Sequence, residues 1–177
     1  MGCRWATKDV TNITKLLIDA EMKMFAGLKT PVIFLQNVLT DLLLGIGFDE
    51  GFKIFSDHVN ERYGAEPGFI TMNMPRLLDV LDKLNISNPI VCANINKIGF
   101  RMCGGIELYE ETIAHRKVRP VAMSVLASGA IPADEAIEYI STLKNVSAVV
   151  FGASTSGNIR HTVQALRKNF PEPRPIA

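Results

Sequence analysis

Val121-Ala-Met-Ser-Val-Leu126 is a short apolar run near the C-terminal end of a chain of 177 residues. The small-residue loop Ala127-Ser-Gly-Ala-Ile-Pro132 follows it, and the next segment, from Ala133 to Leu143, has apolar residues at helical spacing. An apolar run bounded by turn residues predicts a buried strand, and the spacing after it predicts a helix. This stretch therefore predicts one strand-helix unit.

The same order of segments repeats directly afterwards. Ser147-Ala-Val-Val-Phe151 is apolar, Gly152-Ala-Ser-Thr-Ser-Gly157 is a second loop of small residues, and Ile159 to Leu166 has helical spacing. Buried strands that alternate with helices are typical of a parallel sheet. The two units together predict an α/β fold.

Three more units precede this pair, which makes five consecutive βα units. Their predicted strands are Val32–Leu35, Gly68–Met72 and Ile90–Ile95. Their predicted helices are Asp49–Arg62, Pro75–Leu84 and Ile106–His115. The apolar segment Gln36–Gly47 reads either as a short helix or as a packed loop.

We interpret residues 1–177 as a single α/β domain. Residues 1–30 form an N-terminal helical segment, residues 31–169 hold the five units, and residues 170–177 form a proline-rich tail. The predicted first helix runs from Asp9, as its cap, to Gly27. It carries a stripe at helical spacing, made of Val10, Ile13, Leu17, Ala20 and Met24.

Five parallel strands fit two architectures. The first is a partial (β/α)8 TIM barrel that supplies strands four to eight, since a complete barrel has about 250 residues. The alternative is an open, doubly wound parallel sheet. A partial barrel leaves apolar edges, so we expect either a homo-oligomer or a missing N-terminal half-barrel to cover them.

Composition excludes several classes of function. The net charge is +1 without a long basic run, which gives no reason to expect nucleic acid or a membrane surface as partner. No apolar stretch reaches the roughly 18 residues of a membrane span, and no signal peptide is recognised, so we expect a cytoplasmic protein. The three cysteines have no metal-ligand spacing, and we expect no metal site.

Four segments resemble the second half of the aldo/keto reductase barrel. They are Gly68–Leu78, Ile90–Asn96, Val121–Ile131 and Val150–Val163, which are similar to that family's fifth to eighth strands and the loops after them. The resemblance implies an NADP(H)-linked oxidoreductase, or a degenerate relative. A nucleotide or phosphate would lie at the loops after the last two strands.

The resemblance also implies roles for single residues. Gln36 stands at the place of the family's catalytic histidine, Thr71 at the nicotinamide site and Asn96 at the end of the sixth strand, while Arg160 lies one turn after the last loop. The family's catalytic aspartate, tyrosine and lysine come from units that have no counterpart in this chain. Whether the chain is an enzyme therefore stays open.

The two small-residue loops themselves indicate an anion site. Small residues allow backbone N–H groups to approach an anion, and the following helix N-terminus adds partial positive charge. The candidate binding residues are Ser128, Gly129, Gly152, Ser154, Thr155, Ser156 and Arg160. The competing interpretation is that short loops need small residues for tight turns and that Ser156 caps a helix.

Lys97 lies in the polar, glycine-containing loop after Ile90–Ile95. It could clamp a charged ligand or, if desolvated, serve as an amine nucleophile. With the phosphate loops it supports an alternative function, a lyase or isomerase acting on a small phosphorylated metabolite. A third hypothesis is a non-catalytic interaction or oligomerisation module.

Overall fold

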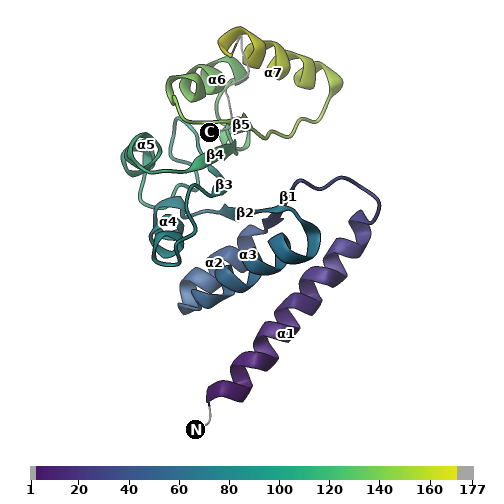
Figure 1. The fold of residues 1–177 in the computed structure, drawn as a ribbon. Coiled ribbons are helices and arrows are strands. Elements are labelled where there is room, and N and C mark those ends of the chain that lie inside the picture. Colours follow the sequence, from purple (N-terminus) through teal and green to yellow (C-terminus); the bar gives the residue numbers. More distant parts are fainter. Residues whose placement is uncertain (1–2, 171–177) are drawn as a thin grey trace.

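The computed structural model describes residues 3–170, with side chains from Val10 onward, and its centre is one parallel sheet. The strands are β1 (Val32–Leu35), β2 (Glu66–Thr71), β3 (Ile90–Asn94), β4 (Arg119–Met123) and β5 (Ala148–Val149). Each pairs in parallel with the next, in the order β1-β2-β3-β4-β5 (Figure 1). The predicted α/β fold with five parallel strands is confirmed.

The strand order also decides between the two predicted architectures. A doubly wound sheet reverses its strand order at a switch point. Here every strand lies beside its neighbour in sequence, without a reversal. Sequential parallel strands with helical crossovers are the arrangement of a (β/α)8 barrel, so the chain forms part of such a barrel.

Helices connect the strands in the expected order. They are α1 (Cys3–Met22), α2 (Asn37–Ile46), α3 (Glu50–Tyr63), α4 (Met74–Lys83), α5 (Ile106–His115), α6 (Ala133–Thr142) and α7 (Ser156–Asn169), with short 3-10 turns η1 (Lys23–Phe25) and η2 (Ala127–Gly129). The segment Gln36–Gly47, for which the sequence allows a short helix or a packed loop, contains the helix α2. Local chemistry explains the start of α4, because the side chain of Asn73 accepts a hydrogen bond from the Arg76 N–H and Pro75 lies in the first turn.

The core lies between the sheet and the helices. Phe69 of β2 is fully buried, and its ring packs against Phe52 and Phe55 of α3 at centroid distances of 5.9 and 5.8 Å. The strand register places Leu35 of β1 beside Phe69 and on the same side of the sheet. Alternate strand residues thus anchor the helical layer.

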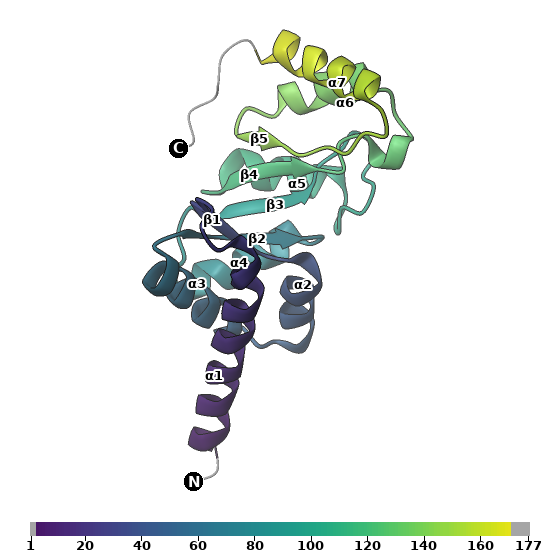
Figure 2. The same cartoon turned by 90° about the vertical axis from the view of Figure 1, so that its right-hand side faces the viewer.

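The other side of the sheet is the inner face of the partial barrel. Register places Phe34, Ile70, Cys92 and Val121 on this face. In Figure 2 the strands β3 and β4 are seen from this side, with α5 behind them. Phe34 remains 37% exposed, so the inner face is only partly closed.

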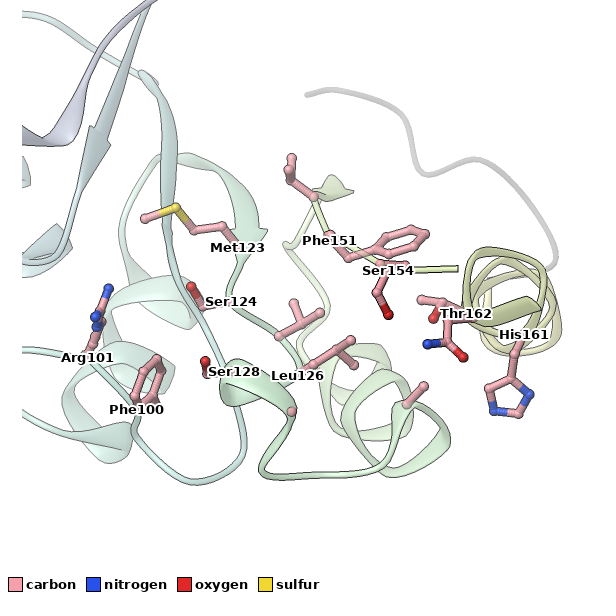
Figure 3. A pocket seen from close by; sticks show the side chains of 17 residues that line it. Phe100, Arg101, Met123, Ser124, Leu126, Ser128, Phe151, Ser154, His161 and Thr162 are labelled. Atoms are coloured by element: carbon pink, nitrogen blue, oxygen red, sulfur yellow. The ribbon is translucent and has the colours of Figure 1, made fainter. Parts of the chain in front are cut away.

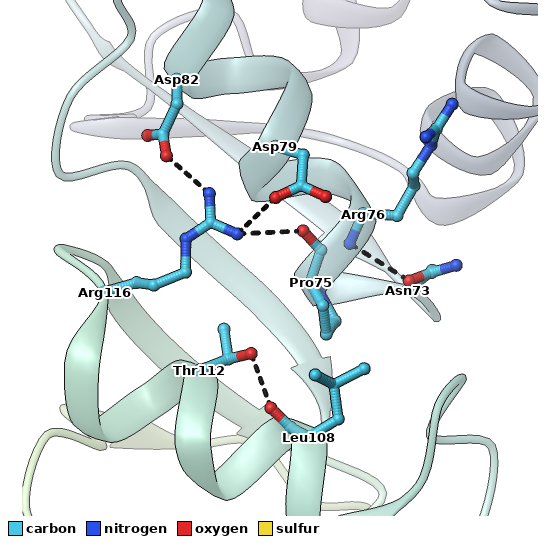
Figure 4. A network of polar contacts seen from close by, with 8 residues as sticks. All are labelled: Asn73, Pro75, Arg76, Asp79, Asp82, Leu108, Thr112 and Arg116. Atoms are coloured by element: carbon cyan, nitrogen blue, oxygen red, sulfur yellow. Dashed lines mark hydrogen bonds and ion pairs between the residues drawn. The ribbon is translucent and has the colours of Figure 1, made fainter.

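Ion pairs fix the outer helices and the N-terminal end of the sheet. Arg116, directly after α5, binds Asp79 at 2.7 Å and Asp82 at 2.5 Å on α4, and donates to the Pro75 carbonyl (Figure 4). Across the sheet, the Arg119 guanidinium of β4 pairs with the Glu66 carboxylate of β2. These bonds hold elements that are distant in the sequence.

Several predicted boundaries are wrong. Because α1 begins at Cys3, Asp9 lies inside the helix and is not its cap. The predicted strand Ser147–Phe151 pairs only at Ala148–Val149, since the chain then turns into a loop. Helix α7 begins at Ser156 and not at Ile159. Of the predicted tail, residues 171–177 lie outside the described residues.

The apolar stripe of α1 points outward. The exposed fractions are 42% at Val10, 57% at Ile13 and 62% at Leu17, and 78% at Met24, which lies in the following turn η1 because α1 ends at Met22. Ile18 and Met22, on the other side of the helix, pack against the core. A stripe that sequence periodicity would assign to the core is therefore uncovered.

Among residues 3–170, no helix combines the length and the apolar character that crossing a bilayer requires.

Candidate functional site

The loops after β4 and β5 line one hollow of about 920 Å³ at the C-terminal ends of these strands. Figure 3 shows Arg101, Ser124 and Ser128 on one side of it and Ser154 and Thr162 on the other. The two small-residue loops that the sequence singles out therefore meet at a common rim, as expected for consecutive parallel strands. In barrels this end of the sheet carries the ligand sites.

The loop after β4 has a tightly wound backbone. Ser124, Ala127 and Ser128 have φ angles of 54°, 46° and 61°, in the left-handed region that non-glycine residues rarely adopt. The N–H groups of Ala127 and Gly129 bond within the loop, to the carbonyls of Ser124 and Leu126, both at 2.8 Å. These two N–H groups are thus used within the loop, and the loop also presents the hydroxyl groups of Ser124 and Ser128 to the hollow.

The loop after β5 leads into α7. Gly152, Ala153 and Ser154 line the hollow, and Thr155 caps α7 by accepting a hydrogen bond from the Asn158 N–H at 3.1 Å. Asn158 then contributes to the lining from the first turn of the helix. The partial positive charge of the helix N-terminus consequently lies beside the hollow.

The described lining of the hollow contains basic side chains and no acidic ones. Arg101 supplies a guanidinium, and His161 supplies an imidazole, whose Nε2 is 3.3 Å from Asp134 Oδ2 on the neighbouring helix α6. No acidic residue is among the described residues that line the hollow. Hydroxyls, an amide and a cation without a carboxylate favour an anionic ligand over a cation.

The predicted binding residues separate into two groups. Ser128, Gly129, Gly152 and Ser154 line the hollow. Thr155 is the cap residue of α7, Ser156 is its first residue, and Arg160 is exposed on the same helix without contributing to the lining. The interpretation of Ser156 as cap is wrong by one residue, because the cap is Thr155.

Asn96 is fully buried and closes its own loop. Its side chain donates to the Phe100 carbonyl at 2.9 Å and accepts from the Phe100 N–H at 2.8 Å. Its hydrogen-bonding groups therefore shape the segment that carries Phe100 and Arg101 to the rim. The structure does not bring Asn96 into the hollow.

Thr71 is also fully buried, at the C-terminal end of β2. Its hydroxyl donates to Asp41 Oδ1 at 2.6 Å and accepts from the Asn73 N–H at 2.9 Å. The second oxygen of Asp41 accepts from the Met72 N–H at 3.1 Å. This network orders the turn into α4, and it lies apart from the hollow.

The two catalytic candidates do not meet. Gln36 is exposed at the start of α2, at the end of β1. Lys97 Nζ binds Glu135 Oε1 at 2.8 Å, and this hydrogen bond raises the pKa of the amine. An amine nucleophile needs its neutral form, so the ion pair suits the charge-clamp role better than the nucleophilic one.

Sequence reasoning did not place the polar side chains of Ser124, Asn158 and Thr162 at the site, nor the guanidinium of Arg101. Ser124 directly follows β4, whereas the apolar run Val121–Leu126 places it inside the predicted strand. Asn158 and Thr162 are four residues apart, so they lie on one face of α7. That spacing could indicate that the two residues share a face, but only if the helix is known to begin at Ser156.

Within residues 3–170 no group of three or more histidine, cysteine, aspartate or glutamate side chains is arranged to hold a metal ion.

Comparison with known proteins gives a fold. No protein-family model and no curated protein matches the sequence. A solved structure of a monomeric dihydrodipicolinate synthase variant matches 94% of this chain and 55% of its own, with 14% identity and a TM-score of 0.55. The Thermotoga maritima dihydrodipicolinate synthase matches 76% of this chain and 44% of its own, with 13% identity and a TM-score of 0.45.

The chain thus spans about half the length of the solved structures that it matches. At this identity the likeness shows the fold, part of a (β/α)8 barrel. It corrects the resemblance drawn from the sequence, because the barrel that matches with a TM-score of 0.55 is a dihydrodipicolinate synthase and not an aldo/keto reductase. The interpretation as an NADP-linked oxidoreductase is wrong. NADP as a cofactor rested on that resemblance and stays an untested prediction.

Proposed function

We propose that this chain is part of a lyase- or isomerase-type barrel that binds a small anionic metabolite in the hollow between the loops after β4 and β5. This function is the lyase or isomerase alternative that the small-residue loops indicate, and it replaces the reductase interpretation. Its class follows the fold match, in which the matched protein is a synthase. The phosphorylated metabolite of the sequence analysis is the first candidate ligand.

One observation carries the proposal. A single hollow is bordered by Arg101, by the hydroxyls of Ser124, Ser128 and Ser154, and by the first turns of α7. No acidic side chain is among its described lining residues. Guanidinium and hydroxyl groups donate hydrogen bonds to phosphate and carboxylate oxygens alike. The shared chemistry is an oxyanion, and the volume admits a small metabolite.

Backbone strain supports a ligand site in the same loop. Ser124, Ala127 and Ser128 are three non-glycine residues in left-handed conformations, each of which costs of the order of 1–3 kcal/mol. Such strain clusters where a loop is shaped for binding.

Isothermal titration calorimetry tests the proposal, with inorganic phosphate and acetate as separate probes. We expect one site per chain for at least one of the two anions, and weaker binding by about tenfold in Arg101→Gln, since a charge-assisted hydrogen bond is worth about 1.5–3 kcal/mol. Arg76→Gln is the matched control, because Arg76 is an exposed arginine on α4 away from the hollow. Equal loss in both variants, or no binding at all, would refute the proposed site.

A further inference from the structure

The arginine at the rim of the hollow is held by contacts that do not neutralise its charge. Arg116 and Arg119 each pair with carboxylates. Among residues 10–170, Arg101 has no such ion pair. Its guanidinium carbon instead lies 5.2 Å from the centroid of the Phe100 ring, and Figure 3 shows the two side chains next to each other on one side of the hollow. An aromatic face attracts a cation without adding a negative charge, so the full charge of Arg101 remains available to an anion.

The backbone of Arg101 has a conformation that its own residue type does not favour. Its φ angle is 55°, in the left-handed region that non-glycine residues rarely adopt. Such a conformation persists only where surrounding contacts determine it. One of these contacts comes from Asn94, whose side-chain amide donates a hydrogen bond to the Arg101 carbonyl at 3.0 Å. The strained residue is therefore fixed from outside its own loop.

Two asparagines at the end of β3 anchor the pair formed by Phe100 and Arg101. Asn94 and Asn96 are 1% and 0% exposed. Asn94 binds the backbone of Arg101, and Asn96 binds both backbone groups of Phe100. Strand β3 lies between β2 and β4, so both anchors belong to the interior of the described sheet and not to its open edges. Each residue of the cation–π pair thus has its own buried anchor.

We infer that Phe100, Asn94 and Asn96 are positioning residues, which hold the Arg101 guanidinium at the rim of the hollow before a ligand binds. An exposed arginine normally loses rotamer freedom when it binds a ligand, and this loss weakens binding. Arg101 has already lost part of that freedom in the folded chain, so more of its interaction with an oxyanion contributes to affinity. This gain in affinity rests on the proposed anion site, whereas the position of the guanidinium does not.

The competing explanation is that the two asparagines only close the loop and stabilise the fold. In that case their substitution lowers stability, and any effect on anion binding is the same with and without the Arg101 guanidinium. In the positioning role, the effect on binding requires Arg101. A double-mutant cycle separates the two explanations.

NMR of the full chain tests the position of the guanidinium without a ligand. The Arg101 Nε–H signal of the ¹⁵N-labelled chain is identified by its absence in Arg101→Gln. We expect this signal to show a ring-current shift and restricted motion, and both should be lost in Phe100→Leu. That variant should fold, because Phe100 is only half-buried. An Arg101 signal as mobile as that of the exposed Arg76, or unchanged in Phe100→Leu, would overturn the inference.

Calorimetric titration with inorganic phosphate, or with acetate if only acetate binds, tests the effect on affinity. Phe100→Leu and Asn94→Ala should each raise the dissociation constant about two- to tenfold, but should leave it unchanged when Arg101→Gln is also present. Equal effects in both backgrounds would overturn the positioning role. If Asn94→Ala does not fold, Phe100→Leu supplies the cycle.

Asn73→Ala is the matched control for the asparagine variants. Asn73 follows β2 and caps α4 by accepting from the Arg76 N–H, and it does not line the hollow. Its substitution should lower the melting temperature and leave the dissociation constant unchanged. If Arg101→Gln itself does not weaken anion binding, the proposed anion site is refuted, and the NMR result alone then decides whether the guanidinium is held in place.

Discussion

Asp19 in α1 and Tyr63 in α3 are joined by a hydrogen bond of 2.6 Å, in which the tyrosine hydroxyl donates to Oδ1 of the carboxylate. His58 Nε2 lies 2.7 Å from the same oxygen. These two hydrogen bonds, the one from Tyr63 first, hold the pKa of Asp19 below its usual range. One carboxylate on the N-terminal helix thus binds two ring side chains of the barrel.

This geometry predicts an acid-sensitive attachment of α1. Because the pKa of Asp19 is lower in the folded chain than in the unfolded chain, its contribution is complete above the usual aspartate range and is lost as pH falls through the lowered value. We expect Asp19→Asn to lower the melting temperature at neutral pH, by a difference that shrinks on acidification. Asp57→Asn on α3, whose carboxylate forms only a surface ion pair with Lys53, should change little. Equal melting temperatures of Asp19→Asn and the native chain at neutral pH would contradict the assignment.

Tyr109 should be required for stability through its hydroxyl group. This fully buried hydroxyl donates to the Met72 carbonyl at 2.7 Å and accepts from the buried Met74 N–H at 3.2 Å, and burial raises its pKa to about 12. Tyr109→Phe leaves both backbone groups without this partner and should cost about 1–3 kcal/mol in urea unfolding. Tyr139→Phe is the control with a smaller expected loss, because that hydroxyl makes one hydrogen bond, to Glu110. Equal losses would contradict this explanation.

The ring of Phe34 should leave no room for a side chain at position 68, which is a glycine. An added Cβ at Gly68 would lie 2.6 Å from Phe34 Cε1 on the inner face of the sheet. Gly68→Ala should therefore destabilise the chain by about 1–3 kcal/mol. Adding Phe34→Ala removes the clash, so the double variant should lose less than the sum of the single losses. Additive losses would contradict the clash with Phe34 as the cause of the loss at Gly68→Ala.

The cysteines should differ sharply in reactivity. Burial raises the pKa of the Cys92 thiol to about 11, whereas Cys103 is exposed. Since the thiolate is the reactive form, a thiol reagent at pH 8 should label Cys103 and spare Cys92. In a Cys3→Ser chain, mass spectrometry should find one label before unfolding and two after it. Rapid native labelling of Cys92 would contradict its buried position on the inner face.

Much of the fold was predictable because its signals are local. The strand Val32–Leu35 and the helix Ile106–His115 occur with the predicted bounds, since apolar runs and turn residues delimit them. Apolar periodicity alone could not reveal which side of α1 is covered. Ile18 and Met22 pack against the core, and α1 lies against α3, which follows β1 and α2 in the sequence.

The site was predictable only in part for the same reason. The loops that carry Ser128 and Ser154 could be located from their small residues and from the strands before them. The hydrogen bond between Asp41 and Thr71 could not be predicted, because the Asp41 carboxylate comes from a helix thirty residues earlier in the sequence. The sequence predicts Asn96 as a binding residue at the end of its strand. In the structure, the reversal of its loop turns both polar groups of the Asn96 side chain toward Phe100.

The most direct measurement of the central claim is an NMR titration of the isotope-labelled chain with inorganic phosphate. If an oxyanion binds between the two loops, the amide shifts should concentrate in residues 124–129 and 152–158 and saturate with one dissociation constant. Shifts confined to one loop, or spread over exposed lysines and arginines without saturation, would contradict the claim that these loops form one site.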